Sequence, residues 1–296
     1  MIHYEQCPVC ESKNLQLFLH AKDYTVSQES FSLIQCNNCG FVFTQDIAPQ
    51  EEIGRYYQSQ DYISHSDTKQ GMINKLYHRV RKITLAGKRK LVSVETGLTK
   101  GSLLDVGCGT GAFLHEMKQA GWSITGLEPD DTAREKALEL YNIQAKPSHE
   151  LFNLEPAGFD AITMWHVLEH VHQLNEYVAQ LDKLLKPGGR LFIAVPNYTS
   201  GDAAHYKESW AAYDVPRHLY HFSPKSMQVL MQRHGLQVKK VKPMWFDSFY
   251  VSMLSEQYKN GKGNMIGAVW NGFISNAKAL FNKERCSSLI YIVSKQ

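Results

Sequence analysis

One stretch of the sequence decides the fold: Leu103-Leu104-Asp105-Val106-Gly107-Cys108-Gly109-Thr110-Gly111. Its apolar run predicts a strand, and the glycine loop that follows opens a helix at 111–120. Glycine loops of this kind also bind dinucleotides and phosphates, so the loop alone does not identify a ligand. Asp105 narrows the choice, because a carboxylate just before the first glycine repels a pyrophosphate and favours a cationic ligand. The loop carries no Lys or Arg, which argues against a phosphate-binding P-loop.

Beyond residue 100, short apolar runs alternate with helical stripes. This alternation predicts an α/β fold with a doubly wound, mainly parallel sheet of seven strands. A long insertion at 246–284 separates the last two strands. The strands are expected at 102–106, 123–128, 143–145, 159–165, 190–195, 236–245 and 286–293, and the helices at 111–120, 130–141, 174–186, 224–234 and 264–281.

Two further strand ends carry residues suited to a nucleotide-like ligand. The second expected strand ends in Glu128, followed by Pro129. An acid at this position of a nucleotide-binding sheet accepts hydrogen bonds from both ribose hydroxyls. The fourth expected strand ends in Trp165, and His166 follows it directly.

Four motifs now stand in a recognisable order: DVGCGTG (105–111), GLEPD (126–130), WHVLEHV (165–171) and LKPGGRLFIAVPN (185–197). Together they resemble the class I S-adenosylmethionine-dependent methyltransferases, which implies a Rossmann-like methyltransferase domain over 98–296. By this resemblance, His166 is also a candidate catalytic residue, whereas Glu169 and His170 cap a helix and pack. The resemblance assigns the cofactor's ammonium to Asp105, its methionine portion to Gly107, Gly109 and Gly111, its ribose to Glu128 beside Pro129, and the cavity near its methyl group to Trp165 and His166.

Four of the six cysteines form two CxxC pairs, Cys7/Cys10 and Cys36/Cys39. Two such turns can complete a tetrahedral shell of four thiolates, which is typical of a structural zinc site without an open position for water. Strands at 15–19 and 31–34 would form the hairpin between the pairs. We therefore predict a zinc ribbon over residues 1–50, with a core separate from that of the methyltransferase domain.

Residues 51–97 are expected to form a helical cap or linker. An apolar stripe from Met72 to Val94 predicts an amphipathic helix. The stretch between Asp67 and Glu95 contains eight basic residues and no acidic residue. A basic segment of this kind indicates either an anionic partner or a solvated helix face. The basic residues are Lys69, Lys75, Arg79, Arg81, Lys82, Lys88, Arg89 and Lys90. Tyr56, Tyr57 and Tyr62 precede all of them.

A loop at 196–222 is too long for a plain connection and is rich in His and Tyr. In an open parallel sheet it lies at the carboxyl ends of the strands, so we predict that it contacts the substrate. Its segment 213–223 resembles the Y-D-x-x-Y-H-E-H-x-x-Y-F-S signature of zinc-containing deoxysugar C-methyltransferases. Aligned on Phe222, the signature's base falls on His218, and its glutamate falls on Arg217. His218 is therefore either the base or a residue that holds the loop through backbone hydrogen bonds.

These features leave three function classes open. The first is an S-adenosylmethionine-dependent methyltransferase acting on a small molecule or a sugar or glycan precursor. The second is an RNA methyltransferase that grips phosphates with the zinc ribbon and the basic helix, although a pI of about 8.4 is low for a nucleic-acid domain. The third is a non-catalytic cofactor-binding regulator, against which the intact glycine loop argues.

The composition of the chain bears on its expected cellular location. The chain of 296 residues is 43% apolar and 21% charged, with a net charge of +3, as in ordinary globular proteins. We expect no membrane span, because no apolar run approaches the ~18 residues that a span needs. We expect no secretory signal, because the N-terminal MIHYEQCPVC has no basic region followed by an apolar stretch. The cysteines should then stay reduced, and a cytoplasmic location is expected. The sequence carries no signal for oligomeric state.

Overall fold

The computed structural model describes residues 1–58, 72–245, 247–261 and 282–296. The expected helix at 264–281, Lys69 and Tyr62 lie outside these residues, as do the side chains of Lys75 and Arg79. Within the described part, no helix is long and apolar enough to span a membrane.

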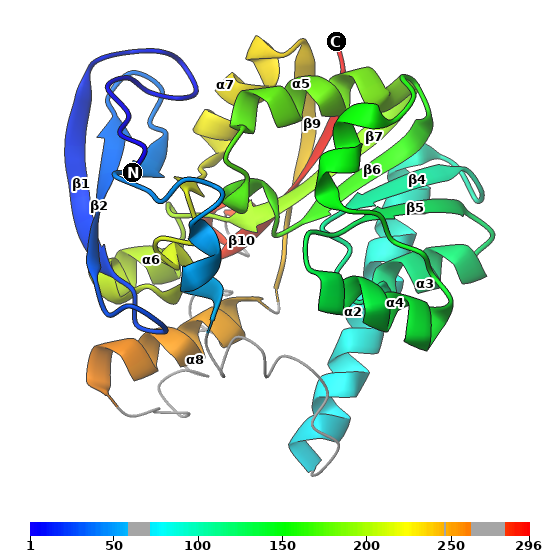
Figure 1. The fold of residues 1–296 in the computed structure, drawn as a ribbon, viewed down its shortest axis with the longest axis horizontal. Coiled ribbons are helices and arrows are strands. Elements are labelled where there is room, and N and C mark those ends of the chain that lie inside the picture. Colours follow the sequence, from blue (N-terminus) through cyan, green and yellow to red (C-terminus); the bar gives the residue numbers. More distant parts are fainter. Residues whose placement is uncertain (59–71, 246, 262–281) are drawn as a thin grey trace.

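The main sheet has six strands in the order β5-β4-β6-β7-β10-β9 (Figure 1). The pairs β4–β5, β4–β6 and β6–β7 are parallel, whereas β10 runs antiparallel to both of its neighbours. The predicted α/β fold with a mainly parallel sheet is confirmed. The strands are β4 (Ser102–Val106), β5 (Ser123–Leu127), β6 (Phe159–Trp165), β7 (Leu185–Pro196), β9 (Leu236–Pro243) and β10 (Ser288–Lys295).

The seventh strand, expected at 143–145, is not formed. The chain there makes a single parallel bridge between Lys146 and Leu127. Lys146 donates its N–H to Gly126, and its carbonyl accepts from Glu128. Pro147 follows and has no N–H to continue the ladder, so the pairing stops after one residue.

Helices cover both faces of the sheet because successive strand residues point to opposite sides. On one face Leu103 and Phe192 pack with α2 and α3, and on the other Leu104 and Leu191 pack with α5 and α7. The helices are α2 (Met72–Thr96), α3 (Ala112–Gln119), α4 (Asp131–Tyr141), α5 (Leu174–Leu184), α6 (Gly201–Tyr206), α7 (Pro224–Arg233) and α8 (Asp247–Asn260), with short 3-10 helices η1 (Ile53–Tyr57), η2 (Ser148–Asn153), η3 (Leu168–His170), η4 (Lys207–Ser209), η5 (Ala211–Tyr213) and η6 (Lys283–Arg285).

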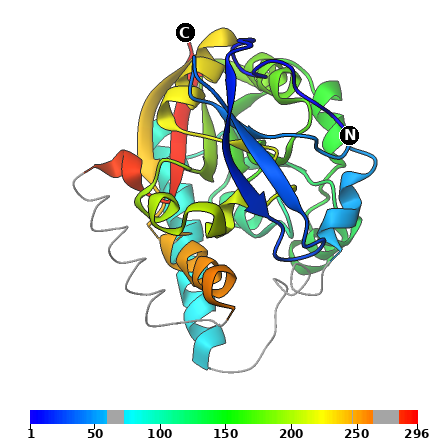
Figure 2. The same ribbon diagram turned by 90° about the vertical axis from the view of Figure 1, so that its left-hand side faces the viewer.

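A second, antiparallel sheet contains the predicted cysteine hairpin. Its order is β1 (Leu15–Lys22), β2 (Ser30–Cys36), β3 (Val42–Thr44) and β8 (Tyr220–His221). The fourth strand, β8, belongs to the loop 196–222, more than 170 residues along the chain. Figure 2 shows the long β1–β2 hairpin lying across the same side of the molecule as this loop.

The N-terminal segment and the main domain share one hydrophobic core. Cys7, Cys36 and Phe41 lie in the same buried cluster as Leu219 and Met227. The expectation of two separate cores is therefore wrong. The cause is the strand pairing of β3 with β8, which inserts the loop into the N-terminal sheet. The division at residues 50 and 97 stays a prediction about chain organisation.

Candidate active site

The glycine loop between β4 and α3 is shaped by three residues with left-handed backbone. Gly107, Gly109 and Gly111 have φ of 72°, 53° and 79°. A Cβ at Gly107 would meet Val167 at 2.3 Å and clash with it, whereas one at Gly111 would crowd Ala137 at 3.1 Å. A Cβ at Gly109 would meet nothing within 4 Å. This side of the loop is the open cradle where a ligand can approach the backbone.

Two carboxylates flank the loop. Asp105 is buried and accepts a 2.5 Å hydrogen bond from the Thr163 hydroxyl. Burial raises the pKa of Asp105 to about 7. Glu128 accepts hydrogen bonds from the backbone N–H groups of Gly109 at 2.8 Å and Asp130 at 3.1 Å, and burial also raises the pKa of Glu128. The two acids therefore border the same loop, and their charges make its surface favourable to a cation.

Trp165 ends β6 beside this surface. Its ring packs edge-on against Phe113, with 5.5 Å between ring centroids. The Lys88 ammonium of α2 lies 4.3 Å from the centroid of the Trp165 ring, which is a cation–π contact. Burial lowers the pKa of Lys88, although Asp105 opposes the shift. One residue of the basic segment therefore faces the candidate site rather than solvent.

His166 lies between two carboxylates. Its Nε2 is 2.9 Å from Oδ2 of Asp247, at the start of α8, and its Nδ1 is 3.3 Å from Oε1 of Glu169. Burial would lower the pKa of His166, but Asp247 and then Glu169 outweigh it and raise the pKa to about 10. His166 is thus an imidazolium at neutral pH, which can donate hydrogen bonds and has no lone pair to accept a proton.

Glu169 has a different environment from the expected one. It caps no helix by a side-chain hydrogen bond and is completely buried. Burial would raise the pKa of Glu169, but the contact with His166 holds it below the usual value. The carbonyl of Glu169 accepts the N–H of Leu219, which fixes the loop 196–222 against η3.

His218 is brought to η3 by this contact. Its ring packs edge-on against the ring of His170, with centroids 4.6 Å apart. Nδ1 of His218 lies 2.9 Å from the carbonyl of Ala212, so it carries the proton and leaves a lone pair on Nε2. Both alternatives that the sequence left open for His218 are compatible with this geometry, because Nδ1 bonds to the loop backbone while Nε2 lies 3.9 Å from Oδ2 of Asp214, beyond hydrogen-bond distance.

The loop itself is held by the N-terminal segment. The guanidinium of Arg217 is buried and pairs with Asp23 at 3.0 Å and with Asp214 at 2.6 Å. Thr44 of β3 donates to the carbonyl of His218 at 2.7 Å. The segment that carries the cysteines therefore sets the position of His218.

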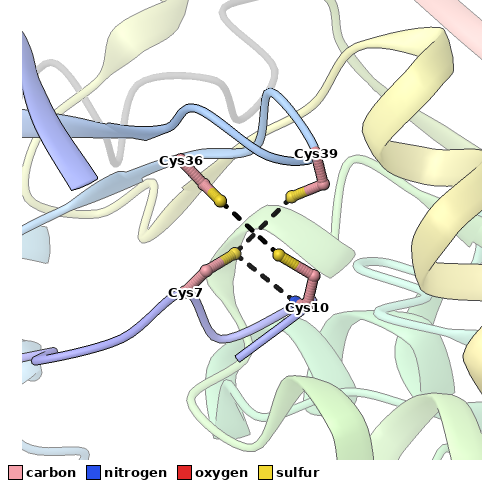
Figure 3. Close-up of side chains that lie close together, drawn as sticks. All are labelled: Cys7, Cys10, Cys36 and Cys39. Carbon is pink, nitrogen blue, oxygen red and sulfur yellow. Dashed lines mark hydrogen bonds between the residues drawn. The ribbon is translucent and has the colours of Figure 1, made fainter. Parts of the chain in front are cut away.

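The four cysteines converge, as predicted, from two turns (Figure 3). The sulfur atoms of Cys7 and Cys39 are 3.6 Å apart, and those of Cys10 and Cys36 are 3.5 Å apart. Four sulfurs at the ~2.3 Å zinc–sulfur distance of a tetrahedral site stand roughly 3.8 Å from one another. The residues present therefore fit a zinc ion, and none of the six cysteines is in a disulfide.

Sequence reasoning missed three residues at the site. Asp247 follows β9 in the insertion, and no motif surrounds it. Lys88 was one of eight basic residues on a helix, and its direction depends on how α2 packs. Glu169 belongs to the WHVLEHV motif, so the sequence could have marked it as a candidate site residue. Its burial among histidines arises only in the folded chain.

Comparison with known proteins identifies the family of the chain. A family model described as a methyltransferase domain matches residues 77–241. That is more than half of the chain, so the chain belongs to this methyltransferase family. The ubiquinone biosynthesis O-methyltransferase of Xanthomonas euvesicatoria is 29% identical over 171 residues, covering 53% of this chain and 71% of the relative. The protein of the same name from Nitrosococcus oceani is 29% identical over 192 residues, covering 60% and 74%.

Solved structures show the same fold. A methyltransferase from Archaeoglobus fulgidus superposes with a TM-score of 0.50 at 18% identity, covering 73% of this chain and 94% of that one. The 1,6-didemethyltoxoflavin N1-methyltransferase of Burkholderia thailandensis, solved with S-adenosylhomocysteine, superposes with a TM-score of 0.51 at 14% identity, covering 93% and 99%. The protein is therefore a class I S-adenosylmethionine-dependent methyltransferase, as its sequence motifs predicted.

The first prediction concerns Glu128. Replacing Glu128 with Ala should weaken S-adenosylmethionine binding by about 1.5–3 kcal/mol, or roughly 10- to 150-fold, because a charge-assisted acceptor for the ribose is lost. Titration calorimetry measures the change. The matched control is Glu155→Ala, at an exposed glutamate outside the site. Equal affinity in the Glu128→Ala and control proteins would refute the ribose assignment.

The second prediction uses the raised pKa of Asp105. A cationic cofactor binds the ionised carboxylate better, so affinity should rise with pH through about 7. Linkage gives roughly a 20-fold rise between pH 5.5 and 7.5. Fluorescence titration of the parent and of Asp105→Asn measures it. The variant should bind weakly with a flatter profile, and the same slope in both proteins would show that Asp105 is not the titrating group.

Proposed function

We propose that this methyltransferase acts on a hydroxyl oxygen of a small molecule. Two relatives that match over more than half of the chain are named ubiquinone biosynthesis O-methyltransferases, and this similarity carries the proposal. The chemistry of the site agrees with it. A hydroxyl acceptor must lose a proton, and the acceptor side of the site presents an imidazole lone pair, Nε2 of His218.

The cofactor side follows from the loop. S-adenosylmethionine, when bound, supplies an electrophilic methyl group on a sulfonium. Asp105 would orient the cofactor's ammonium, Glu128 would accept from the ribose, and the backbone at Gly109 leaves space for the methionine portion. Pro129 would stay beside the ribose, with its carbonyl already bonded to Arg134 at 2.8 Å. Trp165 would line the cavity near the methyl group.

The acceptor side follows from the histidines. His166 is held as a cation by Asp247 and Glu169, so in our proposal it donates a hydrogen bond and stabilises negative charge. His218 would activate the acceptor through Nε2, either by taking the proton itself or through a bound cation. The zinc held by Cys7, Cys10, Cys36 and Cys39 would be structural, since four thiolates leave no open position.

A sugar or glycan precursor is the second candidate acceptor. It rests on the resemblance of segment 213–223 to the deoxysugar enzymes. The loop and the cysteine segment form one sheet, which supports a shared role in binding the substrate. An RNA substrate receives less support, because Lys88 faces Trp165 and Arg89 pairs with Glu116 at 2.8 Å, which removes two charges from a phosphate-binding surface.

A screen with S-adenosylmethionine labelled on the methyl group tests the proposal. Phenols and catechols, nucleotide sugars, and bulk RNA form the three arms. We expect label in the phenol or catechol arm, as an alkali-stable methyl ether. Label only in the sugar arm would select the second candidate, and label only in RNA would overturn the proposal.

A further inference from the structure

Three potential metal ligands meet at the carboxyl edge of the main sheet. Glu169, His170 and His218 each bring one ligand atom within 4.8 Å of the other two. Two of them follow β6 directly in η3, and the third comes from the loop before β8. The hydrogen bond from Leu219 to the Glu169 carbonyl holds the two elements together.

The hydrogen bonds of the two histidines leave both rings ready to bind a cation. Nδ1 of His218 lies 2.9 Å from the carbonyl of Ala212, and Nδ1 of His170 lies 3.0 Å from both the carbonyl of Arg217 and the hydroxyl of Tyr57. A carbonyl oxygen only accepts and a tyrosine hydroxyl can also accept, so a proton on each Nδ1 satisfies these contacts and leaves each Nε2 with its lone pair. Metal-binding histidines characteristically donate their second N–H to a carbonyl in this way.

Glu169 supplies the anionic ligand. Its side chain is 0% exposed, and neither carboxylate oxygen accepts a hydrogen bond from any residue that the structure describes. The contact at 3.3 Å from Oε1 to Nδ1 of His166 is an ion-pair contact and satisfies one oxygen at most. A buried carboxylate with such poor hydrogen bonding is costly unless a further cation pairs with it.

We propose that Glu169, His170 and His218 bind a divalent transition-metal cation, separate from the four-cysteine site. Two imidazoles and one carboxylate are the protein ligands of open catalytic zinc sites. Imidazole ligands select zinc and its neighbours over magnesium or calcium. Three protein ligands leave at least one coordination position open.

The open position would take the acceptor, and this part rests on the proposed function. A hydroxyl oxygen bound to the cation loses its proton to solvent more easily, because the cation lowers the hydroxyl pKa. The oxyanion then forms the new C–O bond as the C–S bond to the methyl group breaks. In this arrangement Nε2 of His218 holds the cation and does not itself take the proton.

Zinc alone is the probe for the test, on the full chain without cofactor or acceptor. The parent, Glu169→Gln and His218→Ala are dialysed against buffered zinc and analysed for metal content. We expect two zinc ions per parent chain, one of them at the cysteines. Each variant should hold one. Loss of a ligand should weaken binding at least about 100-fold, which exceeds the usual cost of changing a residue that only hydrogen-bonds to a ligand.

His149→Ala is the control, because His149 is exposed and lies outside the cluster. It should keep two zinc ions. A thermal melting transition and retention of one zinc ion at the cysteines show that a variant folds. One folded variant is enough to test the proposal. A parent that holds no more zinc than the folded variants overturns the proposal. Because no methyl transfer is measured, a failed acceptor screen leaves this result unaffected, and a missing second zinc leaves O-methylation standing.

Discussion

Replacing Cys36 with Ser is expected to unfold much of the protein at 37 °C and to abolish methyl transfer. Structural zinc contributes about 10–16 kcal/mol of apparent binding free energy in small zinc peptides. Whole domains are stable by only about 5–15 kcal/mol. Loss of the predicted zinc would therefore remove free energy comparable to the entire stability. The shared core containing Cys36 and Leu219 transmits that loss to the main domain.

Calorimetry with a parallel zinc assay measures this effect. We expect one unfolding transition for the whole chain, shifted to lower temperature in Cys36→Ser and after chelation. The matched control is Cys286→Ser, which changes a buried cysteine outside the cluster in the same way. It should keep its zinc. If chelation melted only residues 1–50 and left a second transition at the parental temperature, the cysteine segment would be an independent unit.

The parts of the fold that the sequence predicted best are those with local signals. The strand expected at 102–106 and the one at 159–165 match β4 and β6 residue for residue, because strands buried on both faces are continuous apolar runs. The glycine loop was equally clear, since three positive φ angles close to one another require glycines. The convergence of the four cysteines could be predicted from their spacing alone.

The parts that could not be predicted depend on contacts between distant residues. The pairing of β3 with β8 joins positions about 178 residues apart, and β8 has only two residues, too few to show a strand pattern. Arg217 departs from the deoxysugar signature, and only the fold shows it ion-paired with Asp23. The strand expected at 143–145 is the opposite case, because there the sequence predicted a strand that the fold does not form. Its apolar pattern is present, but Pro147 ends the pairing after one residue.

His218→Ala should reduce turnover by about 10²–10⁴-fold, the usual share of general-base catalysis, and leave cofactor affinity unchanged. The prediction holds whether Nε2 takes the proton or holds a cation, because both routes to the acceptor oxyanion need that lone pair. The proposed cofactor site is separate, since the anchors we propose for it, Asp105 and Glu128, make no described hydrogen bond to His218.

The control for this variant must be a histidine of the same loop that neither site uses. His221 is unsuitable, because it is buried in β8 with its Nε2 3.2 Å from the Thr44 hydroxyl, so its loss would disturb the second sheet. His205 is exposed at the end of α6, and His205→Ala should keep the parental rate.

Steady-state and single-turnover rates and cofactor titrations on the parent, His218→Ala and His205→Ala separate the possible roles of His218. A His218→Ala protein with the parental rate would exclude His218 from acceptor activation. A raised KM at unchanged kcat would assign it to positioning the substrate. A lower kcat at unchanged cofactor affinity is the expected result, because in our proposal Nε2 of His218 activates the acceptor, and His218 clusters with the buried Glu169 carboxylate beside His166.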